Sequence, residues 1–469
     1  MSTKITLKQI NKLAIPAIIS GVSEPILSLT DAAIIGNMSL NPTESLAAVG
    51  IVSTFLSMLI WVLGQTRSAI SSIVSQYLGA SNVDAVKNLP AQAIFLITFL
   101  SLIIIACTYP FASQIFKLYN ASNLILDYSV DYYQIRVWGF PFTLFTIAVF
   151  GTFRGLQNTY HPMLIAIAGA VSNIVFDFIL VYGIANIIPA MHIKGAAYAS
   201  VIAQMLMAGL SAFYMLKKTD IPLLVSFPFN PEIKRFALMI LNLFIRTIAL
   251  NVALYFATSF ATSYGSKYIA AYTIAINLWF LGAFLIDGYA SAGNILSGKL
   301  LGAKDYKNLI DLSNKLIKHG IVVGVIVASV GAILYIPIGE IFSNDIEVLN
   351  AFYDVFWIVL LMQPLCALAF IFDGVFKGLG EMKYLRNLLL FSTLLVFIPV
   401  ISYTDTIGLK LHGIFLAFTL WIIARGLPLI IKFRKTFRPL ASASNNATGH
   451  PSFLFKFKVG RINKLLIDK

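Results

Sequence analysis

Phe153-Arg154-Gly155-Leu156 recurs 223 residues later in the chain as Phe376-Lys377-Gly378-Leu379. Three further short stretches match at the same offset and in the same order: Leu46-Ala47-Ala48 with Ile269-Ala270-Ala271, Leu78-Gly79-Ala80 with Leu301-Gly302-Ala303, and Pro141 with Pro364. Four ordered matches at one offset indicate two copies of one unit. In an apolar chain, such a duplication is typical of secondary transporters, whose site lies between or within the halves.

The composition is that of a polytopic helical membrane protein. Of the 469 residues, 58% are hydrophobic and 12% are charged, whereas soluble domains carry about 25% charged residues. Apolar stretches of about 20 residues or more, long enough to cross the hydrocarbon core, recur along the chain. They are too long for barrel strands, and the first is also too long for a signal peptide, so we expect it to be retained.

Counting the apolar stretches between polar breaks predicts an all-α protein with twelve membrane spans. The predicted spans are residues 13–36, 46–78, 88–116, 128–153, 162–186, 195–216, 236–262, 268–298, 310–338, 350–376, 385–403 and 411–432. The repeat divides them into two six-helix bundles, residues 1–217 and 236–433. Residues 218–235 contain three prolines and are expected to form a cytoplasmic linker, and residues 434–469 a basic cytoplasmic tail.

The distribution of positive charge predicts the orientation. With both termini in the cytoplasm, 26 of the 34 Lys and Arg residues, Arg154 among them, fall in or beside cytoplasmic segments, and four fall in outer segments. This imbalance follows the positive-inside rule. We therefore expect a multi-pass protein of the plasma (bacterial inner) membrane. The same distribution explains the net charge of +14 without a nucleic-acid partner.

Ionisable side chains inside the membrane are costly and are therefore candidates for function. Asn173 and Asp177 are four residues apart and share one face of the fifth predicted span, and Asp31 in the first span lies at a similar depth. Two carboxylates in a poorly solvated cavity cannot both stay ionised cheaply, so one takes up a proton or a cation binds between them. With the Asn173 carbonyl oxygen, this set suits a proton or a hard monovalent ion such as Na⁺.

Glu24 lies two helical turns before Asp31 on the same face and is a further candidate. The alternative role for each acid is structural, as the partner of an intramembrane arginine such as Arg67 or Arg136. Pro16 removes a backbone hydrogen bond in the first span and is a candidate hinge.

The C-terminal half has its own intramembrane charges. Asp287 lies in the middle of the eighth span, and the sequence leaves its role open between functional and structural. Asp373 has Lys377 one turn later, which favours a local ion pair. Arg246 needs a partner that the sequence does not identify, and Arg425 is expected to extend to the inner surface.

Three groups of residues carry a family resemblance. They are Leu13-Ala14-Ile15-Pro16-Ala17-Ile18, Ser23-Glu24-Pro25 and Thr30-Asp31-Ala32-Ala33-Ile34-Ile35-Gly36 in the first span, Ser172-Asn173-Ile174-Val175-Phe176-Asp177 in the fifth, and Leu285-Ile286-Asp287-Gly288-Tyr289-Ala290 with Gly298-Lys299-Leu300-Leu301-Gly302-Ala303 in the eighth. These stretches resemble the multidrug and toxic compound extrusion (MATE) transporters of the DinF-like branch. The resemblance covers all twelve predicted helices but not the tail beyond about Arg438.

The resemblance implies a V-shaped pair of six-helix bundles that exports organic cations or other amphipathic compounds in exchange for protons or sodium ions by alternating access. It implies that Asp31, Asn173 and Asp177 form the coupling-cation site, that a hydroxyl near Ser200 completes it, and that bending at Pro16 is linked to protonation. We expect protons rather than sodium ions, no cofactor, and a monomer in the lipid bilayer that handles small amphipathic molecules.

Two other functions are possible for a chain of this organisation. A flippase for a lipid-linked precursor would also use duplicated six-helix bundles, and Arg67, Arg136 and Arg246 are residues that could bind its pyrophosphate. A membrane-embedded enzyme would need a nucleophile with a base or a metal set, but the chain has no His-Glu-x-x-His and no Gly-x-Ser-x-Gly motif. We therefore expect a transporter and not an enzyme.

Overall fold

The computed structural model describes residues 5–38, 40–184 and 187–445, with the backbone alone for residues 23–29 and 444–445. The described residues form helices α1 (Leu7–Gly36), α2 (Pro42–Leu63), α3 (Thr66–Gly79), η1 (Val83–Val86), α4 (Leu89–Thr108), α5 (Ala112–Leu118), α6 (Asn123–Arg136), η2 (Val137–Gly139), α7 (Phe140–Gly155), α8 (Tyr160–Tyr182), α9 (His192–Lys218), α10 (Ile233–Ser263), α11 (Ser266–Gly302), α12 (Tyr306–Ile333), α13 (Tyr335–Phe342), α14 (Ile346–Gly378), α15 (Met382–Ser392), η3 (Thr393–Phe397), α16 (Ile398–Thr406) and α17 (Lys410–Asn445).

Twelve of these helical units cross the membrane, as the sequence predicted. Eleven are long and apolar enough by the described residues alone, and α1, with 30 residues, is the twelfth. Two predicted spans were too long. The third ends at Thr108 and the ninth at Ile333, and the short helices α5 and α13 follow them at equivalent places in the two halves. Pro110 follows shortly after the end of α4 and has no backbone N–H to continue the helical hydrogen bonds.

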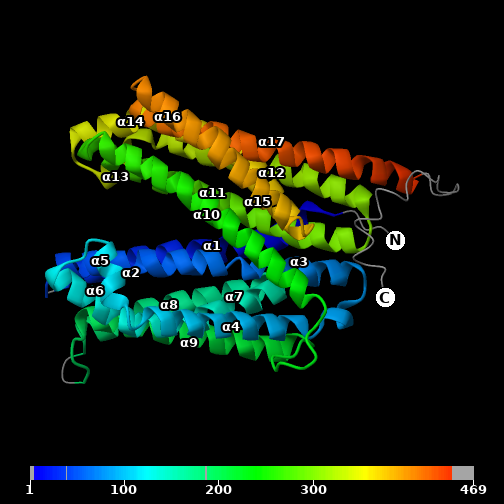
Figure 1. Cartoon of the computed structure of the whole chain (residues 1–469), viewed down its shortest axis with the longest axis horizontal. Coiled ribbons are helices and arrows are strands. Elements are labelled where there is room, and N and C mark those ends of the chain that lie inside the picture. The colour runs from blue at the N-terminus through cyan, green and yellow to red at the C-terminus, as the bar shows by residue number, and fades with distance from the viewer. Residues whose placement is uncertain (1–4, 39, 185–186, 446–469) are drawn as a thin grey trace.

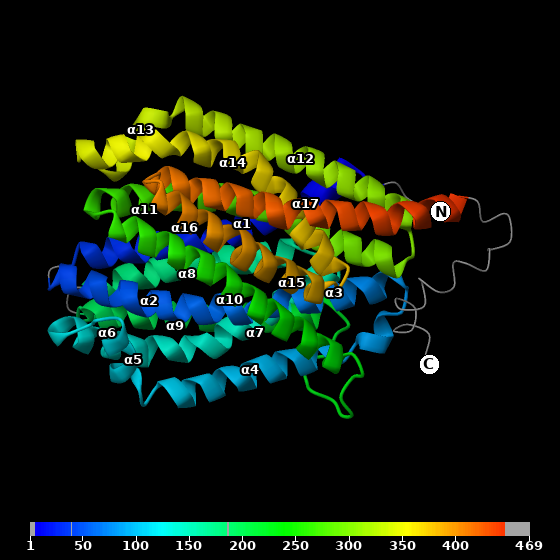
Figure 2. The ribbon, with the colours of Figure 1, turned by 45° about the horizontal axis from the view of Figure 1, so that its top comes forward.

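The two halves form two bundles that diverge in a V. In Figure 1 helices α2 to α9 lie in the lower arm and α11 to α17 in the upper arm. In the turned view of Figure 2, α12 to α14 lie at the top and α4 at the bottom, and the two bundles overlap between them. The start of α1 and the end of α17 lie at the same end of the molecule as α3 (Figure 1). We call this the terminal end; its position in the cytoplasm stays a prediction.

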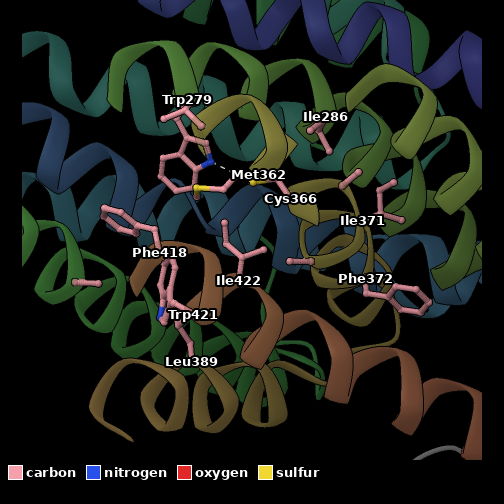
Figure 3. Close-up of a cluster of buried hydrophobic side chains, with 14 of the residues drawn as sticks. Trp279, Ile286, Met362, Cys366, Ile371, Phe372, Leu389, Phe418, Trp421 and Ile422 are labelled. Atoms are coloured by element: carbon pink, nitrogen blue, oxygen red, sulfur yellow. Dashed lines mark hydrogen bonds between the residues drawn. The ribbon is translucent and has the colours of Figure 1, made fainter. Parts of the chain in front are cut away.

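The C-terminal bundle has an aromatic centre. Trp279, Phe418 and Trp421 pack there with Met362 and Ile422 (Figure 3), and the ring centroids of Trp279 and Phe418 are 5.5 Å apart. The indole N–H of Trp279 donates to the Cys366 sulfur at 3.1 Å, and that of Trp421 donates to the Thr393 hydroxyl at 3.0 Å. Both indoles are therefore buried with their polar groups satisfied, as a rigid core requires.

The first helix of each half crosses into the opposite bundle. Near the start of α1, Ile10, Leu13 and Ala14 belong to the core of the C-terminal bundle, whereas Ile34 and Ile35 near its end belong to the N-terminal core. Helix α10 does the reverse, because residues 236, 239 and 243 complete the N-terminal core while the later residues 249–261 join the C-terminal core.

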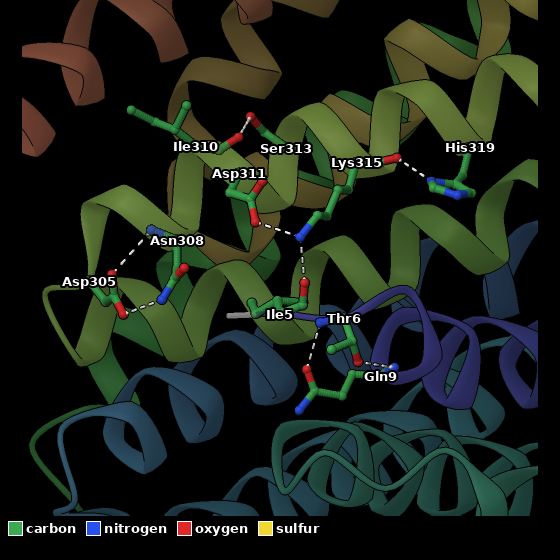
Figure 4. Close-up of polar contacts among 10 residues, drawn as sticks. All are labelled: Ile5, Thr6, Gln9, Asp305, Asn308, Ile310, Asp311, Ser313, Lys315 and His319. Carbon is green, nitrogen blue, oxygen red and sulfur yellow. Dashed lines mark hydrogen bonds and ion pairs between the residues drawn. The ribbon is translucent and has the colours of Figure 1, made fainter. Parts of the chain in front are cut away.

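Polar contacts fasten the start of α1 to the C-terminal bundle. Lys315 on α12 donates its ammonium group to the backbone oxygen of Ile5 at 2.6 Å and pairs with Asp311 at 2.6 Å (Figure 4). Thr6 and Gln9 form a reciprocal capping box that begins the helix. Any movement of α1 therefore involves both bundles.

The bundles meet at the terminal end along α3 and α11. A Cβ atom on Gly79 would collide with the backbone oxygen of Lys299, and one on Gly302 would collide with that of Gln76. Residues 79 and 302, like residues 76 and 299, are related by the repeat offset. The two helices thus cross at a symmetric point that only glycine permits, which we call the glycine crossing.

Residues 219–232 connect the bundles and form no regular helix. The amide of Gln92 donates to the backbone oxygen of Ser226 at 2.7 Å, and the backbone N–H of Asn230 donates to Gln92 at 2.8 Å, so the connection is fixed to the N-terminal bundle. Helix α17 continues to Asn445, so the predicted tail begins as helix. Residues 446–469 lie outside the described part of the chain.

Candidate functional site

Helices α1, α8 and α9 bring the predicted cation-site residues together in the N-terminal bundle (Figure 1). The Tyr182 hydroxyl on α8 donates to the backbone oxygen of Ile34 on α1 at 3.0 Å, which aligns these two helices. Gly195 on α9 lies against the backbone oxygen of Leu180, and a Cβ there would collide with it. These close approaches set the depth at which the polar side chains meet.

Asn173 links the two carboxylates. Its amide nitrogen donates to Asp31 Oδ1 at 3.2 Å and to Asp177 Oδ2 at 2.5 Å. The Ser200 hydroxyl on α9 lies 3.5 Å from Asn173 Oδ1. The structure therefore places Asp31, Asn173, Asp177 and Ser200, all four predicted from the sequence, in one group, which we call the carboxylate cluster.

The carboxylate cluster is shielded from solvent. Asp177 is fully buried, Asn173 and Ser200 are 5% and 1% exposed, and Asp31 is half-buried. Asp177 Oδ1 has no hydrogen-bond partner among the described residues. A buried carboxylate oxygen without a donor is unfavourable unless a proton or cation neutralises it. Together with the amide and hydroxyl oxygens, it gives a set of hard oxygen ligands that fits H⁺ or Na⁺.

Arg136 borders the cluster without neutralising it. Its guanidinium donates to Gln204 Oε1 at 2.8 Å and interacts electrostatically with Asp31 and Asp177. Across the described chain, however, neither acid has an ion-pair contact with Arg136 or Arg67, so the predicted structural pairing of these residues is not present. Gln204 was not predicted, although its spacing of four residues from Ser200 could have identified it.

Three other predicted residues lie elsewhere. Asp287 on α11 is exposed and lines a cavity between the bundles, away from the carboxylate cluster. The side chain of Glu24 lies outside the described residues. Pro16 is half-buried within α1, which continues through it, so its role as a hinge stays a prediction.

The cavity between the bundles has a volume of about 110 Å³. It lies where α3 and α7 of the N-terminal bundle face α11 and α14 of the C-terminal bundle. Its charged lining residues are Arg67, Arg154, Lys377, Asp287 and Asp373, and its neutral polar ones are Gln65, Ser68, Ser71, Ser291 and Asn294. Arg154, which the sequence had placed beside a cytoplasmic segment, is only 6% exposed. Arg154 is the next-to-last residue of α7, so it does lie beside a connecting segment, whose cytoplasmic location stays a prediction, and its side chain faces the other bundle.

Buried charges in the C-terminal bundle are paired. Asp373 contacts Arg246 at 2.5 Å and Lys377 at 3.0 Å, which confirms the predicted Asp373–Lys377 pair and identifies the partner of Arg246. Arg425 does not extend to the surface as predicted. It is 6% exposed and stacks on the rings of Phe370 and Trp421, because a guanidinium is stabilised by such faces where it is desolvated.

Comparison with known proteins gives a consistent result. The MatE family model matches the chain twice, at residues 16–179 and 237–402, one match for each half. Protein DETOXIFICATION 42 of Arabidopsis thaliana is 26% identical over 89% of this chain and 90% of its own length. DNA damage-inducible protein F of Escherichia coli is 24% identical over 91% and 92%, respectively.

The fold also matches solved structures. A crystal structure of MATE in the bent conformation superposes with a TM-score of 0.85 at 20% identity, covering 93% of this chain and 97% of the other. The duplicated six-helix bundle, the V shape and the two family-model matches agree, and MATE proteins are transporters, not enzymes. The chain therefore belongs to the MatE family, the multidrug and toxic compound extrusion transporters.

Proposed function

We propose that this protein exports small amphipathic compounds in exchange for a cation that binds at the carboxylate cluster. The observation that carries the proposal is the contact geometry of Asn173, whose one amide group bonds both Asp31 and Asp177 while Asp177 Oδ1 stays buried without a partner. Such a site is completed by a proton or by Na⁺. We propose the proton as the coupling ion and the sodium ion as the alternative.

Helix α1 transmits the occupancy of this site. It carries Asp31 near one end and contacts the C-terminal core near the other. Neutralising Asp31 changes its interaction with Asp177 and with Arg136, and thereby the preferred packing of α1 on α8. Because α1 also contacts α11, a shift or a bend at Pro16 alters how the bundles meet, which is the requirement for alternating access.

Exchange follows if the cation-bound and cation-free forms prefer opposite openings. In the proposed cycle, the outward-open state releases cargo when the ion binds, and the inward-open state releases the ion to the cytoplasm. An ion that bound both states equally would shift nothing, so the model requires tighter ion binding in the outward-open state. The sequence leads us to expect cationic compounds as cargo, so they are the first class of compound to test.

The test is transport of the cationic dye ethidium into inside-out vesicles that contain the full-length protein. Vesicles with wild type, Asp31→Asn or the control Asp354→Asn are energised with a proton gradient or a sodium gradient. We expect uptake with one gradient only, lost in Asp31→Asn and kept in the control, because Asp354 is exposed and outside the cluster. An Asp31→Asn protein that is folded and still transports at the full rate would overturn the assignment.

The flippase alternative keeps one specific observation in its favour. The cavity between the bundles is lined by Arg67, Arg154 and Lys377, and cationic side chains at this position suit a phosphate-bearing head group better than an organic cation. We therefore treat the charge of the cargo as a separate question.

A further inference from the structure

We propose that the cavity between the two bundles binds an anionic group of the cargo, a carboxylate or a phosphate, between Arg67 and Arg154. The inference rests on the proposed function in one respect, which is that the bound ligand is the compound that the protein transports. The binding site itself rests only on the geometry of the cavity and can be tested without transport.

Two arginines reach the cavity with hydrogen-bond donors to spare. Arg154 on α7 donates one amino group to the Ser291 hydroxyl across the interface at 2.8 Å. Its Nε, like that of Arg67 on α3, is buried without a partner among the described residues. A Cβ on Gly151 would lie 2.7 Å from the Arg67 backbone oxygen, so α3 and α7 touch here. Arg154 is one helical turn from Gly151, which brings the two side chains to the same cavity.

The acids of the cavity do not balance these arginines. Asp373 is already committed to Arg246 and Lys377. Asp287 is exposed and forms no ion pair within the described residues, but it interacts electrostatically with Arg154, so it offsets at most one of the two positive charges. Two like charges that share one cavity are unfavourable without a counter-charge. The planar, forked guanidinium group matches the two oxygens of a carboxylate or a phosphate.

The size of the cavity determines what part of a ligand it can hold. Its volume of about 110 Å³ is well below the roughly 300–1,000 Å³ of pockets that enclose a drug-sized molecule. Gln65, Ser68 and Asn294 add neutral hydrogen-bonding groups around the arginines. The site therefore accommodates an anionic head group, and the remainder of an amphipathic molecule extends outside it.

Binding at this position involves the contact between the bundles. Arg154 belongs to the N-terminal bundle and Ser291 to the C-terminal bundle, and their bond spans the interface. An anion held by Arg154 competes for the same guanidinium and weakens that bridge. The cargo site thus lies on α3, α7, α11 and α14, and the cation site lies on α1, α8 and α9. Because the two sites share no residue, the cargo and the cation influence each other through the packing of the helices.

The direct test is binding of carboxyfluorescein, an anionic dye, to the purified full-length protein in detergent, followed by fluorescence anisotropy. We expect Arg67→Gln and Arg154→Gln each to weaken binding by about tenfold or more, the effect of losing a charge-assisted hydrogen bond. Arg67→Lys and Arg154→Lys keep the charge without the fork and should lose less. Raising the salt concentration should weaken wild-type binding.

Two control variants separate charge from packing. Ser291→Ala removes the bridge to Arg154 but leaves both guanidiniums, and should bind the dye at least as tightly as wild type. Lys432→Gln removes a cation that pairs with Glu381 and lies outside this cavity, and should not change binding. If Ser291→Ala weakens binding as much as Arg154→Gln does, Arg154 has only a structural role and the proposal is wrong.

Competition distinguishes the source of the anionic group. Displacement of the dye by inorganic pyrophosphate indicates a soluble anion or a free phosphate group, and displacement by lysophosphatidic acid alone indicates a lipid head group. Either result supports the anion site if the arginine variants abolish it. No saturable binding to folded wild type, or equal binding by both Gln variants, overturns it. Ethidium transport in the same variants reports on the proposed function independently, since it depends on Asp31.

Discussion

The two halves of this transporter share one backbone plan and differ in their buried charges. The repeat offset places Leu254, Val396 and Val400 of the C-terminal half where the N-terminal half has Asp31, Asn173 and Asp177. Conversely, the C-terminal bundle holds the paired Arg246 and Asp373, and Phe150 occupies the position equivalent to Asp373. Duplication therefore copied the packing and not the chemistry, which resides in sites added to a fold.

The buried acids of the two halves also differ in how completely their oxygens are paired. In the C-terminal bundle Asp373 has two cationic partners. In the N-terminal bundle Asp177 keeps an oxygen without a partner in the part of the chain that the structure describes. The first arrangement stabilises a fixed structure, whereas the second is suited to exchange of a ligand. Mutating one acid in each half should separate these roles.

The largest effect is expected for Asp177→Asn. Because this change removes the buried carboxylate that the coupling ion requires, gradient-driven ethidium uptake should fall to the level seen without a gradient. The folded state should not suffer, since an amide replaces an uncompensated buried charge. The two measurements are ethidium uptake and the urea- or SDS-induced unfolding of the purified protein. A large loss of stability with retained uptake would show that Asp177 stabilises the fold and does not bind the coupling ion.

Asp373→Asn should have the opposite effect, a loss of stability with ion exchange retained. Removing the charge leaves Arg246 buried without its counter-ion, which costs about 3–5 kcal/mol of unfolding free energy. Unfolding in mixed micelles with increasing SDS measures this loss. The protein that remains folded should still exchange the coupling ion. If Asp373→Asn is as stable as wild type, the C-terminal charges are not a structural network.

The glycine crossing tests the symmetry of the two halves. Gly79→Val and Gly302→Val should each destabilise the closed contact at the terminal end by about 1–3 kcal/mol, the usual cost of overpacking. The two variants should behave alike because they occupy equivalent positions. Gly50→Ala is a suitable control, since a Cβ there meets no atom within 4 Å. A severe effect at one glycine only would show that the crossing is not symmetric in function.

Ser200→Ala should give the smallest change. The hydroxyl lies 3.5 Å from Asn173 Oδ1, a weak contact, so its loss should shift the apparent affinity for the coupling ion by less than about tenfold. Ethidium uptake measured over a series of proton or sodium concentrations gives this shift. A complete loss of coupling would place Ser200 among the essential ligands and would enlarge the polar set of the N-terminal half.

The fold was largely predictable from the sequence because its determinants are local. Span length and loop charge depend on neighbouring residues and predicted the twelve helices, and the repeat, which is visible in the sequence itself, divided them into two bundles. The cluster was predictable as well, since Asn173 and Asp177 share a helix face and Asp31 lies at the same depth. Hydrophobicity, however, does not show which bundle a buried face contacts, so the crossing of α1 and α10 could not be foreseen.

The failures concern contacts between distant residues. Arg246 and Asp373 are 127 positions apart, and nothing in the sequence pairs them. The prediction for Arg425 considered its distance from the surface and not the aromatic rings beside it. Arg154 lies at the end of α7, but the sequence did not show that its side chain bonds Ser291 of the other bundle. In each case the environment of the charge is created only when helices that are distant in the sequence pack together.

The exchange of first helices between the bundles has a consequence for how such a protein forms and arose. Phe236, Met239 and Leu243 of the second half belong to the N-terminal core, so this core is complete only after the start of the second half has been synthesised. Expressed separately, each would expose the surface that the other half's first helix covers. A single-copy ancestor with this packing would have been a dimer that swapped its first helices, and gene fusion would have made that swap permanent within one chain.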